Sequence, residues 1–258
     1  MNNNLIDIKQ SIMIFVSISV IISFLYSTMS DSASASSEMV FLKDEMPFGL
    51  SYSDWSEKFW IWQSQTFEDP ENSENWLGVA ENGCFMRDEG PVVMLIDPAY
   101  GYTLNQKCAI SSTDGILIDL WSGECDSAMK EFENASFKQI SDCARGFDLG
   151  KIKTTLRVDG TIVSELQATD WTTNILNNAV ESRTNEMHLT LEKGTRIPTD
   201  PNKWGGTYLA AAHGWYVILK PLSPGNHTID YENQVSSTTL SGAGNQNLAH
   251  ITYHLMVK

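Results

Sequence analysis

The stretch HGWYVILKPLSPGNHTIDY, residues 213–231, decides the fold class. Trp215, Val217 and Leu219 point to one side of a strand, whereas Tyr216 and Ile218 point to the other. A strand that is apolar on both faces must be covered on both faces. The stretch therefore predicts a strand inside the fold and not at the edge of a sheet.

The segment PLSPG, residues 221–225, predicts a turn, because proline cannot donate to a strand ladder and glycine accepts tight backbone angles. Residues 227–231 alternate again, and we expect them to return beside the first strand as a central hairpin. Shorter apolar runs elsewhere have the period of strands: residues 92–96, 107–110, 116–120, 155–158, 161–163, 187–191 and 250–258. Short strands separated by turns predict a mainly β protein, a β-sandwich or jelly roll.

Two further hairpins are expected, at residues 92–110 and at residues 155–163. Residues 92–96 and 107–110 are expected to form a hairpin, and Trp121 to Cys125 to leave the strand at 116–120 as a loop. Asp159-Gly160 is the clearest two-residue hairpin signal in the chain. Residues 171–185 fit either a loop or a short helix.

One N-terminal amphipathic helix is predicted over Asp54 to Gln65, after the capping candidates Ser51 and Ser53. Its apolar stripe is expected to pack on the sandwich, and it consists of Tyr52, Trp55, Phe59 and Trp62. A short second helix is expected within residues 135–147.

Residues 1–35 have the layout of a secretory signal peptide. An apolar run from Ile12 to Tyr26 is followed by small residues that end at Ala35, the expected cleavage site. An uncleaved N-terminal anchor is the alternative, because the run approaches the length of a membrane span. Residues 36–258 then form a single domain, secreted or at the cell surface, with the membrane as a partner only through an uncleaved leader.

The charge balance excludes some partners. The chain has 17 basic and 32 acidic residues, a net charge of −15. This opposes binding to nucleic acid or to anionic lipid, since both require a cationic surface. It agrees with a soluble protein that works outside the cell.

Four cysteines, an even number behind a secretory leader, predict disulfides. Of the three connectivities we expect Cys84–Cys108 and Cys125–Cys143, because each encloses one local unit. The cysteines lack the close spacing of a zinc site, so we expect neither a metal nor another cofactor. A calcium loop at Asp69, Glu71 and Ser73 is the weaker interpretation of a polar loop.

Several segments together resemble a widespread family of secreted prokaryotic proteins without an assigned activity. The segments are YSDWSEKFWIW, a Gly-Cys pair at 83–84, Glu124-Cys125, LRVDG, GWYVILKPLSPGNHTI and ITYHLMV. The resemblance spans residues 48 to 257. It implies a secreted single domain with paired cysteines, and it carries no catalytic residues.

Catalytic motifs are absent from the sequence: there is no G-x-S-x-G, HExxH or phosphate loop. Asp119 and Glu124 flank Trp121, and paired carboxylates of this kind serve glycoside hydrolases. His250 and His254 share one face of the last strand, but positions four apart in a strand are separated by about 13 Å, too far for one ion. No histidine has an acidic partner nearby in the sequence.

The eight tryptophans suggest binding, because indole rings stack on sugars and anchor protein contacts. The candidates for a binding surface are Trp60, Trp76, Trp121 and Trp204. Asn134 and Asn226 begin N-glycosylation sequons.

Three functions remain open from the sequence. The first is a secreted or surface-attached protein that binds an envelope protein or glycan. The second is an extracellular hydrolase that uses Asp119 and Glu124, and the third is a structural subunit that self-assembles on the surface. We expect the first and not an enzyme.

Overall fold

The computed structural model describes residues 38–65, 84, 86–95, 103–146, 151–169, 172–191, 201–236 and 247–258. Its helical elements are η1 (Pro47–Gly49), α2 (Tyr52–Gln65), η2 (Lys130–Phe132), α4 (Phe137–Arg145) and η3 (Pro201–Lys203). Its strands are β1 (Met86–Asp88), β2 (Val92–Leu95), β3 (Thr103–Ile110), β4 (Gly115–Asp126), β5 (Lys151–Val158), β6 (Thr161–Thr169), β7 (Thr172–Asn177), β8 (Val180–Arg183), β9 (Met187–Thr190), β10 (Thr207–Leu219), β11 (Gly225–Ser236) and β12 (Asn247–Val257). Within this part of the chain, no helix has the length and apolar character needed to span a bilayer.

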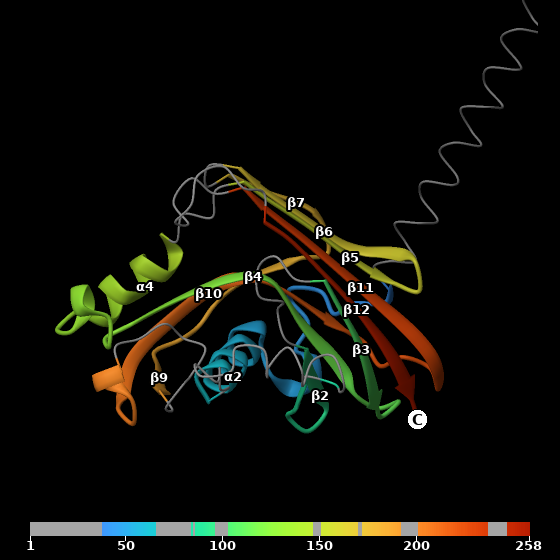
Figure 1. The fold of residues 1–258 in the computed structure, drawn as a ribbon, viewed down its shortest axis with the longest axis horizontal. Helices are drawn as coiled ribbons and strands as arrows, with labels where there is room; N and C mark the ends of the chain where they lie inside the picture. Colours follow the sequence, from blue (N-terminus) through green and yellow to red (C-terminus); the bar gives the residue numbers. More distant parts are fainter. Residues whose placement is uncertain are drawn as a thin grey trace, which may run out of the picture.

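The strands form two sheets that pack face to face (Figure 1). The first sheet has the order β1-β2-β4-β10-β8, with β9 also paired to β10, and the second has the order β3-β12-β11-β5-β6-β7. The largest apolar cluster lies between them. Helix α2 covers the outer face of the first sheet, and α4 packs on the ends of β4 and β10. The predicted β-sandwich with a packed N-terminal helix and a short second helix is confirmed.

Strand β10 has the position that its alternation predicts. It pairs with β4 on one side and with β8 and β9 on the other. Trp215, Val217 and Leu219 belong to the core between the sheets, whereas Tyr216 and Ile218 pack under α2. A strand that is apolar on both faces is thus covered by a sheet on one face and by a helix on the other.

The predicted central hairpin is wrong. Strand β10 lies in the first sheet and β11 in the second, so residues 220–224 cross from one sheet to the other. Both edges of β10 are already occupied, and β11 pairs instead with β12 and β5. Alternation gives the face of each strand but not its neighbour, and a proline-containing connection suits a crossing as well as a tight turn.

The predicted pairing of β2 with β3 is also wrong. Strand β2 pairs with β1 and, in parallel, with β4, whereas β3 lies parallel to β12 in the second sheet. Both predicted disulfides are confirmed, with Cα–Cα distances of 4.9 Å for Cys84–Cys108 and 6.0 Å for Cys125–Cys143. The first therefore does not close a hairpin: it links Cys84, two residues before β1, to the second sheet. The second ties β4 to α4.

A β-bulge keeps residues 121–125 inside β4, where the sequence predicts a loop. Trp215 pairs with Trp121 and Tyr216 with Asp119, so Leu120 is the extra residue. The Tyr231 hydroxyl, from the second sheet, donates to the Leu120 carbonyl at 2.8 Å. This bond satisfies a carbonyl that the bulge removes from the ladder. As a result Leu120 and Trp121 both enter the core between the sheets.

Helix α2 begins at a reciprocal capping pair. The Ser51 backbone N–H donates to the Asp54 carboxylate at 2.9 Å, and the Asp54 N–H donates to the Ser51 hydroxyl at 3.2 Å. The four residues of the predicted stripe are all buried, so that prediction is confirmed. The β5–β6 hairpin is confirmed too, with φ of 49° at Asp159 and 79° at Gly160. The ambiguous stretch 171–185 contains strands β7 and β8.

Candidate functional site

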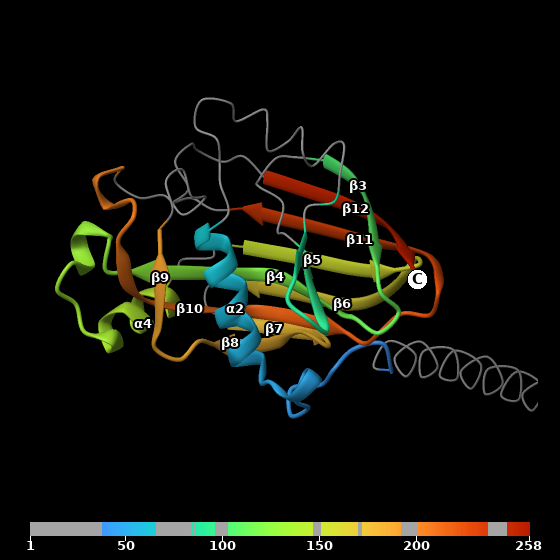
Figure 2. The ribbon, with the colours of Figure 1, turned by 90° about the horizontal axis from the view of Figure 1, so that it is seen from below.

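The outer face of the second sheet is the main exposed sheet surface. Inward side chains of β11 and β12, such as Tyr231 and Tyr253, fill the core, so the alternate residues point outward. In the described part of the chain no helix covers this face, whereas α2 covers the first sheet (Figures 1 and 2). We call this surface the outer face.

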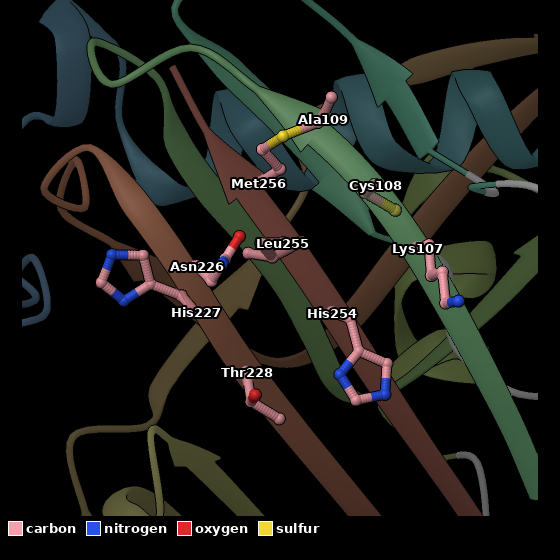
Figure 3. A pocket seen from close by; sticks show the side chains of 9 residues that line it. All are labelled: Lys107, Cys108, Ala109, Asn226, His227, Thr228, His254, Leu255 and Met256. Carbon is pink, nitrogen blue, oxygen red and sulfur yellow. The ribbon is translucent and has the colours of Figure 1, made fainter.

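A hollow of about 430 Å³ opens on the outer face over β3, β12 and β11 (Figure 3). We call it the outer hollow. The strand register sets its side chains in two rows: His254 lies between Lys107 and Thr228, and Met256 lies between Ala109 and Asn226. One row thus carries an ammonium, an imidazole and a hydroxyl, and the other carries a thioether beside an amide; Met256 is 47% exposed.

Charge on the outer face is balanced, unlike that of the whole chain. Its described outward side chains include three basic and three acidic residues, Lys107, Lys153, Arg157, Glu165, Asp230 and Glu232. The chain as a whole carries −15. A neutral, hydrogen-bonding surface on an acidic protein does not repel acidic partners as the rest of the surface does.

A serine, a histidine and an aspartate meet where β10 crosses to β11. His227 Nδ1 lies 2.7 Å from Asp159 Oδ2, and its Nε2 lies 3.4 Å from the Ser223 hydroxyl. These residue types match a hydrolase triad. However, Nε2 lies only 2.8 Å from the Ser223 carbonyl oxygen, which can only accept a hydrogen bond. Both ring nitrogens therefore donate, and no base remains to activate Ser223.

This arrangement is an ion pair that joins two parts of the second sheet. The hydrogen bond to Asp159 raises the pKa of His227, and Asp159 also accepts the Thr228 N–H at 2.8 Å. His227 thereby ties the β5–β6 turn to the start of β11. The sequence separation of 68 residues explains why no local pattern indicated the pair.

We expect Asp159→Asn to lower the pKa of His227, because the carboxylate favours the charged ring. Since the folded pKa lies above that of the unfolded chain, this pair stabilises the fold below about pH 6.5. The stabilisation is lost as the pH rises through the folded pKa. NMR titration of the His227 ring checks the change.

Ser223→Ala is the matched control for this titration. It removes the hydroxyl but keeps the carbonyl to which Nε2 donates, so the pKa of His227 should hardly move. A large fall in the alanine variant, or none in the asparagine variant, would contradict the assignment of the ion pair.

A second pair that the sequence did not indicate joins His213 of β10 to Glu181 of β8. His213 Nε2 lies 3.0 Å from Glu181 Oε1. Burial lowers the pKa of His213, and the hydrogen bond from His213 lowers the pKa of Glu181. A neutral His213 ring that donates to a charged Glu181 carboxylate agrees with both lowered pKa values. His213 and Glu181 come together only because β8 pairs with β10.

The two carboxylates of the hydrolase hypothesis lie on the same face of β4, toward α2. Asp119 is 4% exposed and accepts the Ser122 hydroxyl at 2.5 Å, and Glu124 is 5% exposed. Asp126, which the sequence did not single out, follows on the same face and is 1% exposed. Burial, and then the charge of Asp126, raise the pKa of Glu124. Side chains so deeply buried do not present themselves to a polymeric substrate.

The four candidate tryptophans lie in different environments. Trp121 is not at the surface as predicted: the bulge places it in the core between the sheets, 3% exposed. Trp60 is half-buried, and its indole donates to the Tyr216 hydroxyl at 3.1 Å. Trp204, between η3 and β10, is half-buried as well. Trp76 and the predicted calcium loop at residues 69–73 lie outside the described residues.

Both sequon asparagines are exposed, Asn134 after η2 and Asn226 at the rim of the outer hollow. Their glycosylation stays a prediction. Within the described ranges, no three metal-binding side chains are grouped around a common point.

Comparison with known proteins adds little. No protein-family model matches the sequence, and no curated protein is similar to it. Among solved structures, a mutant of the CFA/I adhesin CfaE from enterotoxigenic E. coli aligns at 16% identity, over 57% of this chain and 37% of that chain. The TM-score of 0.14 is too low for this likeness to support any statement about fold or function. What the chain itself provides is a disulfide-bonded β-sandwich, of the kind that matures in an oxidising compartment.

Proposed function

We propose that this protein is a secreted or surface-attached binding protein that contacts an envelope protein or glycan through its outer face. The observation that carries this proposal is the outer hollow, which sets a row of polar groups beside an exposed methionine on a sheet that no helix covers in the described part of the chain. Pockets that bind ligands combine a few convergent polar groups with apolar surface in this way.

The strand framework gives the outer hollow a defined shape. Each of its three strands is held in register along the hollow, β12 by β3 on one side and by β11 on the other. The disulfide at Cys108 fixes β3 from below. Little backbone freedom is therefore lost on binding, which favours affinity.

The hydrolase alternative receives less support, because Asp119 and Glu124 are buried under α2. Self-assembly is the better second candidate. In the described residues β3 and β7 pair on one side only, so each has an edge that a strand of another copy can join. Sedimentation velocity over a range of concentrations separates the two candidates, since only assembly makes the particle grow.

We expect Lys107→Glu to weaken binding to envelope fragments from the source cells on the order of tenfold, as charge reversal at an interface does. The side chain is exposed at the hollow, so the melting temperature should hardly change. Cosedimentation of the protein with the fragments measures the bound fraction.

Lys130→Glu is the matched control, because it makes the same charge change at an exposed residue of η2. Equal losses in both variants would indicate a general effect of net charge and would remove the outer hollow from the proposal. Failure of the unmodified protein to bind any envelope fraction would contradict the proposed function itself.

A further inference from the structure

Exposed apolar side chains gather in one short segment between residue 42 and residue 48. Among the described residues, the large apolar side chains that are exposed are Leu42 (49%), Met46 (60%), Phe48 (36%), Ile162 (36%) and Met256 (47%). Three of these five belong to this segment. We call Leu42, Met46 and Phe48 the apolar patch. Exposed apolar side chains that follow closely within one segment, and are not scattered singly over the surface, indicate an interaction surface.

The apolar patch stands on a fixed backbone. Val40 forms a bridge with Leu219 at the end of β10, and the Lys220 N–H donates to the Met39 carbonyl at 2.9 Å. The Trp55 indole, from α2, donates to the Pro47 carbonyl at 2.9 Å. The patch therefore lies at the margin of the sandwich, just before α2 in the chain (Figure 2). It is displayed by a rigid segment and not by a fraying end.

Two tight turns shape the segment that carries the patch. The Glu45 N–H donates to the Leu42 carbonyl at 3.0 Å, and the Gly49 N–H donates to the Met46 carbonyl at 3.1 Å. Phe48 has a left-handed φ of 54°, a conformation that bulky residues rarely adopt. Its ring occupies the space where Gly115 lacks a side chain, since a Cβ there would lie 2.6 Å from the ring.

Charge around the patch is balanced. The two basic residues Lys43 and Lys220 offset the two acidic residues Asp44 and Glu45. The Glu45 carboxylate accepts a hydrogen bond from the Leu42 N–H at 2.5 Å, and it lies 4.0 Å from the Lys220 ammonium. A neutral area on a chain of net charge −15 can approach a phospholipid surface without the repulsion that the rest of the protein would meet.

We propose that the apolar patch rests on the surface of a lipid bilayer, with Leu42 and Met46 inserted at the boundary between headgroups and acyl chains. In the uncleaved form of the chain the apolar run from Ile12 to Tyr26 supplies the attachment, because it ends fewer than twenty residues before Leu42. A tether that short keeps the bilayer at a high effective concentration, so a small apolar contact is enough. Three side chains are too few for a stable dimer, which buries roughly 800 Å² on each partner.

This inference concerns a different surface from the outer hollow, so the membrane proposal and the proposed binding function are tested independently. The patch would orient the domain on the bilayer, while the outer face would contact the partner. Binding of envelope protein or glycan by the outer face does not require that the patch touch lipid.

The test uses the full chain added to preformed phosphatidylcholine vesicles. Because the apolar run is expected to attach the uncleaved chain by itself, the readout is local: the rate at which chloramine-T, a charged oxidant, converts each methionine to its sulfoxide. Met46 and Met256 have similar exposure and lie in different parts of the structure, so Met256 is the internal control. We expect Met46 to be oxidised at least tenfold more slowly than Met256. Peptide mass spectrometry measures both rates.

Leu42→Glu should restore oxidation of Met46 to the rate of Met256, because a charge at the boundary costs more than the remaining apolar contact provides. Equal rates for the two methionines in the unmodified chain would overturn the proposal. Protection of Met46 that grows with protein concentration at constant lipid would overturn it as well, since a second copy would then cover the patch.

Discussion

Replacing Trp55 by alanine is expected to lower the free energy of unfolding by about 3–5 kcal/mol, the range found for large aromatic residues truncated in a core. Trp55 is 1% exposed and lies between α2 and the first sheet. The substitution leaves a cavity under the helix. It also removes one of the two donors to the Pro47 carbonyl and leaves only the Leu50 N–H, at 3.2 Å.

Urea denaturation followed by far-ultraviolet circular dichroism measures this effect without relying on tryptophan emission, which the substitution itself alters. Trp204→Ala is the matched control, because it removes the same side chain from a half-buried position. Its cost should be clearly smaller. A loss below about 1 kcal/mol for Trp55→Ala would mean that α2 does not depend on its apolar stripe for attachment to the sheet.

Replacing Glu124 by glutamine is expected to stabilise the protein at neutral and alkaline pH. Glu124 is 5% exposed, its Oε1 lacks a hydrogen-bond partner among the described residues, and the neighbouring carboxyl of Asp126 has an oxygen in the same condition. Burial and the charge of Asp126 raise the pKa of Glu124. The amide has nearly the same shape, carries no charge and offers an N–H toward Asp126.

The sign follows from proton binding. The folded protein keeps a proton on Glu124 at a pH where the unfolded chain has released it, so stability falls as the pH rises above about 4.5 toward the folded pKa. The slope reaches about 1.4 kcal/mol per pH unit for one proton. Glutamine abolishes this contribution, and the stability of the variant should therefore exceed that of the parent increasingly with pH.

Thermal or urea unfolding at a series of pH values between 4 and 8 checks this expectation. Glu131→Gln, at an exposed position of η2, removes the same charge without relieving any burial and should leave the pH dependence in place. If Glu124→Gln were less stable than the parent at pH 8, the carboxylate would have to be charged and paired in the fold.

Local sequence patterns predicted the elements whose stability is local. The capped stripe of α2, the Asp159-Gly160 turn and the two faces of β10 all depend on residues within a few positions of one another. The disulfides were predictable because each joins cysteines fewer than thirty residues apart. Their structural settings were less so, since Cys84–Cys108 joins a position before β1 to the second sheet and closes no hairpin.

Strand partners were not predictable in the same way. The alternation of β11 fits either sheet, and only the fact that both edges of β10 are occupied sends β11 across to β12 and β5. The bulge at Leu120 depends on Tyr231, which comes from another sheet and lies 111 residues later. The sequence therefore predicts Trp121 at the surface, whereas the bulge turns it into the core.

The same distinction between local and long-range interactions applies to the candidate sites. The sequence by itself determined which side chains are available: the acidic balance, the two disulfides, the apolar helix stripe and the run before residue 36. Only the tertiary structure decided which of them meet, namely Lys107, His254 and Thr228 across the outer hollow and His227 with Asp159. It also decided that Leu42, Met46 and Phe48 stay exposed. The physical reason is that backbone propensity and side-chain periodicity act over a few residues. The neighbours of a strand are chosen by burial and hydrogen bonding between segments far apart in the chain.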